Sequence, residues 1–207
     1  MSQFFQIHPE NPQTRLIKQA VEIIEKGGVI AYPTDSAYAL GCHLGDKRAV
    51  DRIRQIRRLT EKHNFTLMCR DLTDISVYAK VDNWQYRQVK AHTPGPFTFI
   101  LDATSEVPRR LMNPKRRQIG IRIPDNMIAL ALLEELSQPL MSTTLILPED
   151  DVPMTDPYEI RALLEHTLDL VIDGGFCGFE ATSVVDLSSE SPVVLRKGCG
   201  DVSAFES

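Results

Sequence analysis

Short apolar runs alternate along the chain with segments in which apolar residues recur at helical spacing. Continuous apolar runs are typical of strands buried on both faces, and they predict strands over residues 29–31, 65–69, 97–103, 119–123, 139–147 and 168–173. The helical spacing predicts helices over residues 12–26, 47–59, 72–79, 83–92, 126–136 and 157–166. Two more apolar runs, 184–187 and 193–196, predict a closing antiparallel pair. This order predicts an α/β fold, a twisted open mixed sheet with surrounding helices, as a single domain over residues 1–207.

Local signals fix the ends of two of these elements. Asn11 and Pro12 have the residue types of an N-cap and a first helical position. Gly27-Gly28 then ends the first helix and leads into the strand at Val29. That strand is stopped by Pro33, and Thr34, Asp35 and Ser36 follow at its exit. Strand exits of open α/β sheets often carry chemistry, although a plain turn capped by hydroxyls is the alternative.

Charge is distributed unevenly along the chain, although the net charge is only −5. Residues 46–70 hold eight Lys or Arg against three acidic residues, and residues 109–124 hold six against none. Residues 125–173 hold eleven acidic residues against one arginine. This separation predicts one basic side that attracts polyanions and one acidic side, unless the segments form unrelated solvated faces.

Three groups of side chains are candidates for ligand contacts. Arg54, Arg57 and Arg58 lie at i, i+3 and i+4 of a predicted helix that has few acidic partners, which favours an anionic ligand. Arg122 lies inside an apolar strand, where a charge is rarely tolerated unless it is paired or faces a cavity. In the strand over 139–147, alternation places Ser142 and Thr144 on one face.

Several classes of protein are disfavoured by what the sequence lacks. No P-loop, dinucleotide-binding, nucleophile-elbow or HExxH motif is present. The four cysteines and five histidines are scattered without metal spacing, so we expect a reduced, cytoplasmic protein without a metal site. The sequence shows no signal peptide and no run long enough to cross a membrane. The remaining hydroxyls and arginines at strand ends suit the binding of phosphates and carboxylates.

Five blocks, in this order, are AYPTDSAYALG, PGPFTFIL, IGIRIP, TSVVDL and VLRKG. Together they resemble the YrdC/YciO family, most of all its YciO branch, over nearly the whole chain. The resemblance implies a twisted open α/β sheet that encloses a basic concave cavity. The best-understood members are threonylcarbamoyl-AMP synthases, which join L-threonine, bicarbonate and ATP, release pyrophosphate and serve a tRNA modification. Members have also been treated as binders of double-stranded RNA.

The resemblance also implies roles for individual residues. The substrate-binding residues would be Thr34, Arg122 and Ser183. The nucleotide and phosphate side would consist of Arg54, Arg57, Arg58, Lys62, Ser142, Thr144 and Arg196, with Mg²⁺ accompanying ATP. Two positions depart from the family pattern. Gln55 stands where the family has a lysine if Arg57 is the motif arginine, and Thr144 stands where the family has an asparagine.

These departures predict weakened or altered catalysis and leave two hypotheses. The favoured one is a protein that binds double-stranded or structured RNA through a basic concavity and retains an ATP pocket. Its RNA contacts would be Arg57, Arg58, Arg116 and Arg117. The alternative is a threonylcarbamoyl-AMP synthase that binds ATP and L-threonine, with weak or divergent activity.

Overall fold

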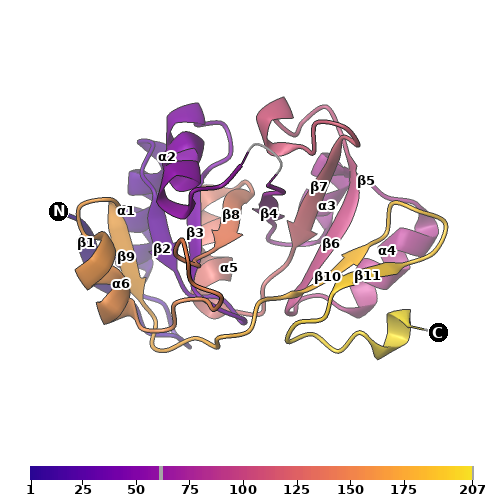
Figure 1. Cartoon of the computed structure of the whole chain (residues 1–207). Helices are drawn as coiled ribbons and strands as arrows, with labels where there is room; N and C mark the ends of the chain where they lie inside the picture. Colours follow the sequence, from indigo (N-terminus) through magenta and orange to yellow (C-terminus); the bar gives the residue numbers. More distant parts are fainter. Residues whose placement is uncertain (61–62, 207) are drawn as a thin grey trace.

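The fold, seen in a computed structural model, is described for residues 1–60 and 63–206 and is built on one twisted sheet (Figure 1). The strands in the described residues are β1 (Gln3–Gln6), β2 (Ile30–Tyr32), β3 (Ala39–His43), β4 (Thr66–Met68), β5 (Ala79–Lys80), β6 (Phe97–Ala103), β7 (Gln118–Arg122), β8 (Leu140–Thr144), β9 (Leu170–Asp173), β10 (Ser183–Asp186) and β11 (Val193–Arg196). Their order is β1-β9-β2-β3-β8-β4-β7-β6-β10-β11, and β5 pairs with β6. The sheet contains both parallel pairs, such as β4–β7, and antiparallel pairs, such as β3–β8, which confirms the predicted mixed open α/β sheet.

Helices flank this sheet at the predicted places. They are α1 (Thr14–Glu25), α2 (Lys47–Arg57), α3 (Leu72–Tyr78), α4 (Asn83–Ala91), α5 (Met127–Leu136) and α6 (Pro157–Leu164), with short 3-10 turns at Arg109–Leu111 and Ser203–Phe205. Asn126 caps α5 through the N–H of Ala129, and Asp156 caps α6 through the N–H of Tyr158. These caps satisfy backbone donors that a helix leaves unpaired at its start.

Several elements differ from the sequence prediction. The first helix begins after Gln13 and not at Asn11-Pro12, and the Gln13 side chain accepts a hydrogen bond from the N–H of His8 outside the helix. The strands β1, β3 and β5 were not predicted; β1 is a four-residue segment with polar ends and β5 has only two residues, so both give little periodic signal. β8 ends at Thr144 because the N–H of Ile146 bonds back to the carbonyl of Thr144 and turns the chain.

Two apolar clusters pack on the sheet. One joins α1 and α5 to β2 and β9, with Ile24, Leu132 and Ile172 among its buried members. The other runs beneath α2 and along the central strands, where Leu67 and Phe99 are fully buried. Full burial of such side chains stabilises the fold by about 1.5–3 kcal/mol each, so the strands between the clusters form a rigid support.

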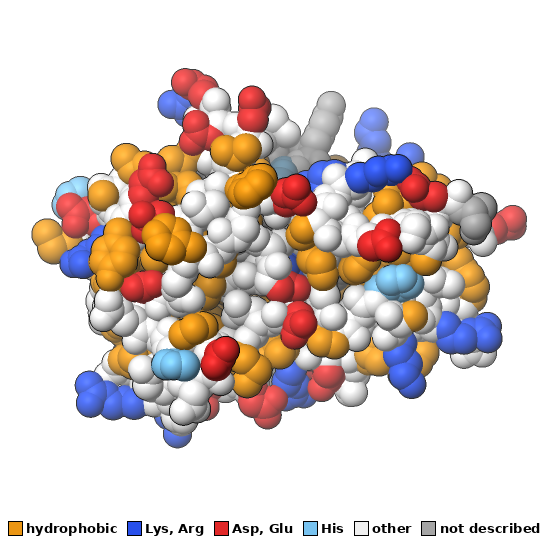
Figure 2. Space-filling view, turned by 90° about the horizontal axis from the view of Figure 1, so that it is seen from below, with side chains coloured by type: hydrophobic (Ala, Val, Ile, Leu, Met, Phe, Trp, Pro, Cys, Tyr) orange, Lys and Arg blue, Asp and Glu red, His pale blue; other side chains and the backbone are white. Residues whose placement is uncertain are grey.

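The charged segments of the sequence do not form two separate sides. Three ion pairs join the basic segment 46–70 to the acidic segment 125–173: Arg52 to Asp169, Arg58 to Glu149 and Arg70 to Glu134. They meet because β8, which lies between Glu134 and Glu149 in the chain, pairs with β3 and β4 on either side of α2, and because β9, which follows Asp169, pairs with β2. Seen from below, acidic side chains lie near the middle of the face and basic ones mainly toward its edges (Figure 2). Within the described residues, no helix is long and apolar enough to cross a membrane.

Candidate functional site

A cavity of about 380 Å³ lies where α2 and the strands β3, β4, β6, β7, β8, β10 and β11 contribute side chains or backbone to a common hollow. Its volume is in the range of small-ligand sites. Arginines and hydroxyls dominate its polar wall: Ser36, Arg57, Thr98, Arg122, Ser142, Thr143, Thr144, Thr182 and Arg196. No Asp or Glu is among its lining residues in the described part of the chain. The wall therefore suits an anionic ligand.

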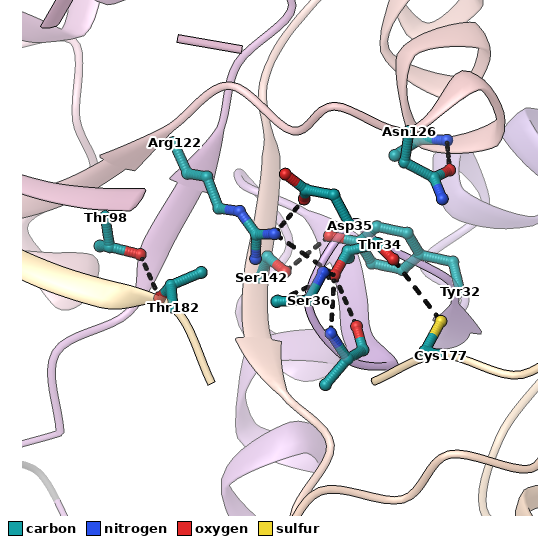
Figure 3. Close-up of polar contacts among 12 residues, drawn as sticks. Tyr32, Thr34, Asp35, Ser36, Thr98, Arg122, Asn126, Ser142, Cys177 and Thr182 are labelled. Carbon is teal, nitrogen blue, oxygen red and sulfur yellow. Dashed lines mark hydrogen bonds and ion pairs between the residues drawn. The ribbon is translucent and has the colours of Figure 1, made fainter. Parts of the chain in front are cut away.

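Arg122, on one side of this wall, is held at the exit of β7 by a buried ion pair (Figure 3). Its Nη2 donates to Asp35 Oδ1 and to Thr34 Oγ1, and the two charged side chains are only 6% and 10% exposed. Arg122 Nε and Asp35 Oδ2 have no hydrogen-bond partner among the described residues. The Asp35 carboxylate thus balances the charge of the guanidinium, and both hydrogens of Nη2 are used within the protein, whereas Nε is left without a partner in the described part of the chain.

The turn after β2 is shaped by Thr34. Its hydroxyl accepts from the N–H groups of Ser36 and Ala37 at 3.1 and 3.2 Å and donates to the carbonyl of Ala37 at 2.6 Å. Such local bonds fix a hydroxyl-capped turn. Thr34 is buried and is not among the cavity-lining residues, whereas Ser36 is. Thr34 therefore contacts Arg122 and helps to position it. It does not itself line the cavity, although the sequence predicted a direct contact with substrate.

The β8 side of the cavity carries three hydroxyls in a row. Ser142 bonds to Tyr32 through the two hydroxyl oxygens at 2.6 Å, and burial raises the pKa of Tyr32 to about 12. Thr143 accepts from Arg57 Nη1 at 2.6 Å, while Arg57 Nε donates to the carbonyl of Ile146. Thr144 completes the row at the strand end. Burial lowers the pKa of Arg57, but a guanidinium stays protonated, so a partly desolvated positive charge borders the cavity.

The opposite side is built by β6, β10 and β11. Arg196 donates from Nε to the carbonyl of Thr182 at 2.9 Å and from Nη2 to its hydroxyl at 3.1 Å. Thr182 in turn bonds to the hydroxyl of Thr98 at 2.9 Å (Figure 3). Ser183 points elsewhere: it donates to the carbonyl of Gly200 and accepts from the N–H of Gly198. On this side of the cavity the lining hydroxyls are those of Thr98 and Thr182, which sequence reasoning missed.

The remaining predicted cations do not line the cavity. Arg54 donates to the carbonyls of Thr60 and Arg110, and Arg58 pairs with Glu149 at the exposed end of α2. The expected patch of three unpaired arginines is therefore not formed, because carbonyls and a carboxylate from other elements reach two of them. Arg116 and Arg117 lie in a turn outside the cavity wall. Lys62 falls outside the described residues, and Gln55 is exposed on α2.

His63 is a further cavity residue that the sequence did not single out. Its Nε2 lies 3.1 Å from Thr143 Oγ1, and burial, followed by Arg57 and Arg54, lowers its pKa to about 4. The only signal was its position just after a basic helix and before a buried strand, and a histidine there is usually a structural residue. Sequence spacing could not reveal that β8 brings Thr143 against it.

The Asp35 carboxylate should be essential for the stability of this arrangement. Asp35→Asn keeps the shape but leaves the buried Arg122 charge uncompensated, so we expect a loss of about 3–5 kcal/mol in the free energy of unfolding. Urea unfolding followed by circular dichroism measures it. Asp125→Asn is the control. Asp125 is exposed and follows β7, the strand of Arg122, so this substitution should change stability by less than about 0.5 kcal/mol. Parent-like unfolding of Asp35→Asn would contradict this view of the pair.

Comparison with known proteins identifies relatives that share this fold. YciO of Escherichia coli is 58% identical over 205 residues, which cover 99% of this chain and 100% of that protein. Its crystal structure superimposes with a TM-score of 0.96 at 57% identity over 99% of this chain and 100% of the other. A threonylcarbamoyl-AMP synthase of Coxiella burnetii is 28% identical over 162 residues, 78% of this chain and 86% of that protein.

A further solved relative carries a ligand. The structure of P. abyssi Sua5 complexed with L-threonine matches with a TM-score of 0.87 at 25% identity, over 94% of this chain and 57% of that one. The sequence model of the Sua5/YciO/YrdC family, described as "telomere recombination", matches residues 22–198. The chain therefore belongs to the Sua5/YciO/YrdC family.

Proposed function

We propose that the cavity binds ATP and a small amino acid, L-threonine in the first instance, and supports chemistry of the threonylcarbamoyl-AMP synthase type. The carboxylate oxygen of N-carboxylated threonine would bond to the α-phosphorus of ATP while the bond to pyrophosphate breaks. The observation that carries this proposal is that Arg57, Arg122 and Arg196 border a single cavity whose described lining holds no carboxylate. Such a displacement depends mainly on positioning and on neutralising phosphate charge.

Within this proposal each arginine has its own task. Arg122 is fixed at a buried strand exit beside the Thr34 turn, which suits the carboxylate of the amino acid. Arg57, at the end of α2, reaches β8 beside Ser142 and Thr144, which suits the phosphates. Arg196 and Thr182 would bind the nucleotide from the facing wall. The relatives support the pairing, because one is called a threonylcarbamoyl-AMP synthase and another was solved with L-threonine.

Mg²⁺ belongs to the proposal as a companion of ATP. The wall offers hydroxyls of Ser142 and Thr144 but no carboxylate among its described residues. Mg²⁺ commonly keeps water ligands and binds substrate phosphates, so this donor set fits an ion that arrives with the nucleotide. When bound it would neutralise phosphate charge. A role in supplying a tRNA modification would also place the protein in the cytoplasm.

Thr144→Asn tests the proposal through activity. The amide adds donors at the cavity wall that a threonine hydroxyl lacks, and a missing donor in a dry site costs about 1–3 kcal/mol. We therefore expect faster threonine-dependent release of pyrophosphate from ATP, measured with bicarbonate and Mg²⁺, with and without threonine. Gln55→Lys is the matched comparison, because position 55 is exposed and outside the wall, and it should give the smaller gain. A Thr144→Asn variant that folds, binds ATP and shows no gain would contradict this assignment.

RNA binding remains a second candidate because one specific observation favours it. Lys115, Arg116 and their neighbours form an exposed basic turn between β6 and β7, and none of the ion pairs seen in the described residues involves this turn. A-form RNA is bound largely through phosphates and shape. Ion pairs with the acidic segment use Arg52, Arg58 and Arg70, so the remaining basic surface gives RNA less support than the cavity gives small ligands.

The RNA candidate predicts a change in salt dependence. Arg116→Gln combined with Arg117→Gln should lower the slope of duplex-RNA affinity against salt by about one per lost phosphate contact. Fluorescence anisotropy over a salt series measures this slope. Arg15→Gln with Lys18→Gln, on the exposed face of α1, serves as a charge-matched control. If both pairs of substitutions behave alike, the basic turn is not an RNA site.

A further inference from the structure

His63 lies in the cavity between a cation and an aromatic ring. It lines the cavity beside Arg57 and Phe65. Its ring meets that of Phe65 edge-on, with centroids 5.2 Å apart, and its Nε2 reaches Thr143 Oγ1 at 3.1 Å. The imidazole is thus fixed in place at the wall that Arg57 borders, where the proposed function puts phosphate.

The hydroxyl of Thr143 forms hydrogen bonds with both Arg57 and His63. Arg57 Nη1 donates to Thr143 Oγ1 at 2.6 Å, and a guanidinium has no acceptor, so the direction of that bond is fixed. The hydroxyl hydrogen is then available to donate to Nε2 of a neutral His63. This arrangement places the imidazole proton on Nδ1. A protonated His63 would have to donate from Nε2 as well, and Thr143 would then lie between two cations.

The charges around the ring oppose protonation while no anion is present. Burial contributes most to lowering the pKa of His63, and Arg57 and Arg54, both on α2, lower it further to about 4. No described carboxylate offsets these two arginines, because the β-strand walls contribute only Arg122 and Arg196 as charged cavity residues. At neutral pH His63 is therefore uncharged, although it lies in a wall suited to anions.

We propose that His63 is a proton-linked ligand of phosphate, which takes up one proton from solvent when a pyrophosphate group binds beside Arg57. This rests on the proposed function and adds a residue to its phosphate side. Phosphate oxygens would bring negative charge against the ring and accept from Nε2–H, and a nearby opposite charge favours the charged form of histidine. The proton returns to solvent when pyrophosphate leaves. His63 thus makes or breaks no covalent bond and acts as a binding residue.

The test is calorimetric titration of the full chain with inorganic pyrophosphate near neutral pH, in two buffers of different ionisation enthalpy. The difference in measured heat gives the number of protons taken up. We expect net uptake in the parent and its loss in His63→Gln, whose side chain does not titrate. His166→Gln, at an exposed histidine, is the matched control and should behave as the parent. Between pH 8 and pH 6 the parent should gain more affinity than His63→Gln, by at most about tenfold per pH unit. Pyrophosphate also titrates in this pH range, but its titration is the same for all three proteins, so the difference between them reports on His63.

Each other outcome overturns the proposal in a distinguishable way. Equal proton uptake by the parent and a folded His63→Gln would assign the proton to another group. Pyrophosphate binding by the parent without proton uptake would remove the role of His63 and leave the proposed function standing. If the parent binds neither pyrophosphate nor ATP, both proposals fall. Should His63→Gln not fold, imidazole NMR titration of the parent decides: the pKa of His63 must rise on adding pyrophosphate, and an unchanged value overturns the proposal.

Discussion

The site depends on one buried ion pair, between Arg122 at the exit of β7 and Asp35 in the turn after β2. Two desolvated charges are tolerated only when they are paired, and removing one partner costs several kcal/mol. The pair therefore ties the turn to a strand that lies four places away from β2 in the sheet order. Any ligand that binds Arg122 meets a guanidinium whose position is already fixed, so little ordering entropy opposes binding.

Shared hydroxyls extend this constraint across the cavity. Thr34, Thr143 and Thr182 each hold an arginine, namely Arg122, Arg57 and Arg196. Each hydroxyl lies on a different element, so the three guanidinium groups are held independently around a common hollow. Preorganised donors are most effective where negative charge is transferred. This division suits a reaction between an amino-acid carboxylate and a triphosphate better than the binding of one extended polyanion.

The apolar pattern predicted the helices and most strands, because their buried faces read as continuous apolar runs or as apolar residues at helical spacing. The same reasoning flagged Arg122, since a charge within the apolar run of β7 needs a partner or a cavity. It could not identify Asp35 as that partner, because 87 residues separate them and only the strand order brings them together. Arg58 illustrates the opposite error: its lack of acidic neighbours on α2 concealed Glu149, which arrives from the loop after β8. Spacing along one helix reports local pairs and carries no information about pairs made through the sheet.

The most direct test of this account is calorimetric titration of L-threonine into the parent and into Arg122→Lys, each with a non-hydrolysable ATP analogue present. Lysine keeps the charge but loses the planar fork of guanidinium. We expect threonine to bind the parent and to lose about tenfold or more in affinity in the variant, which is about 1.4 kcal/mol, while thermal unfolding shows that the variant is folded. Equal threonine affinity in the two proteins would contradict the account, because Arg122 would then be a structural partner of Asp35 and not a ligand of the substrate.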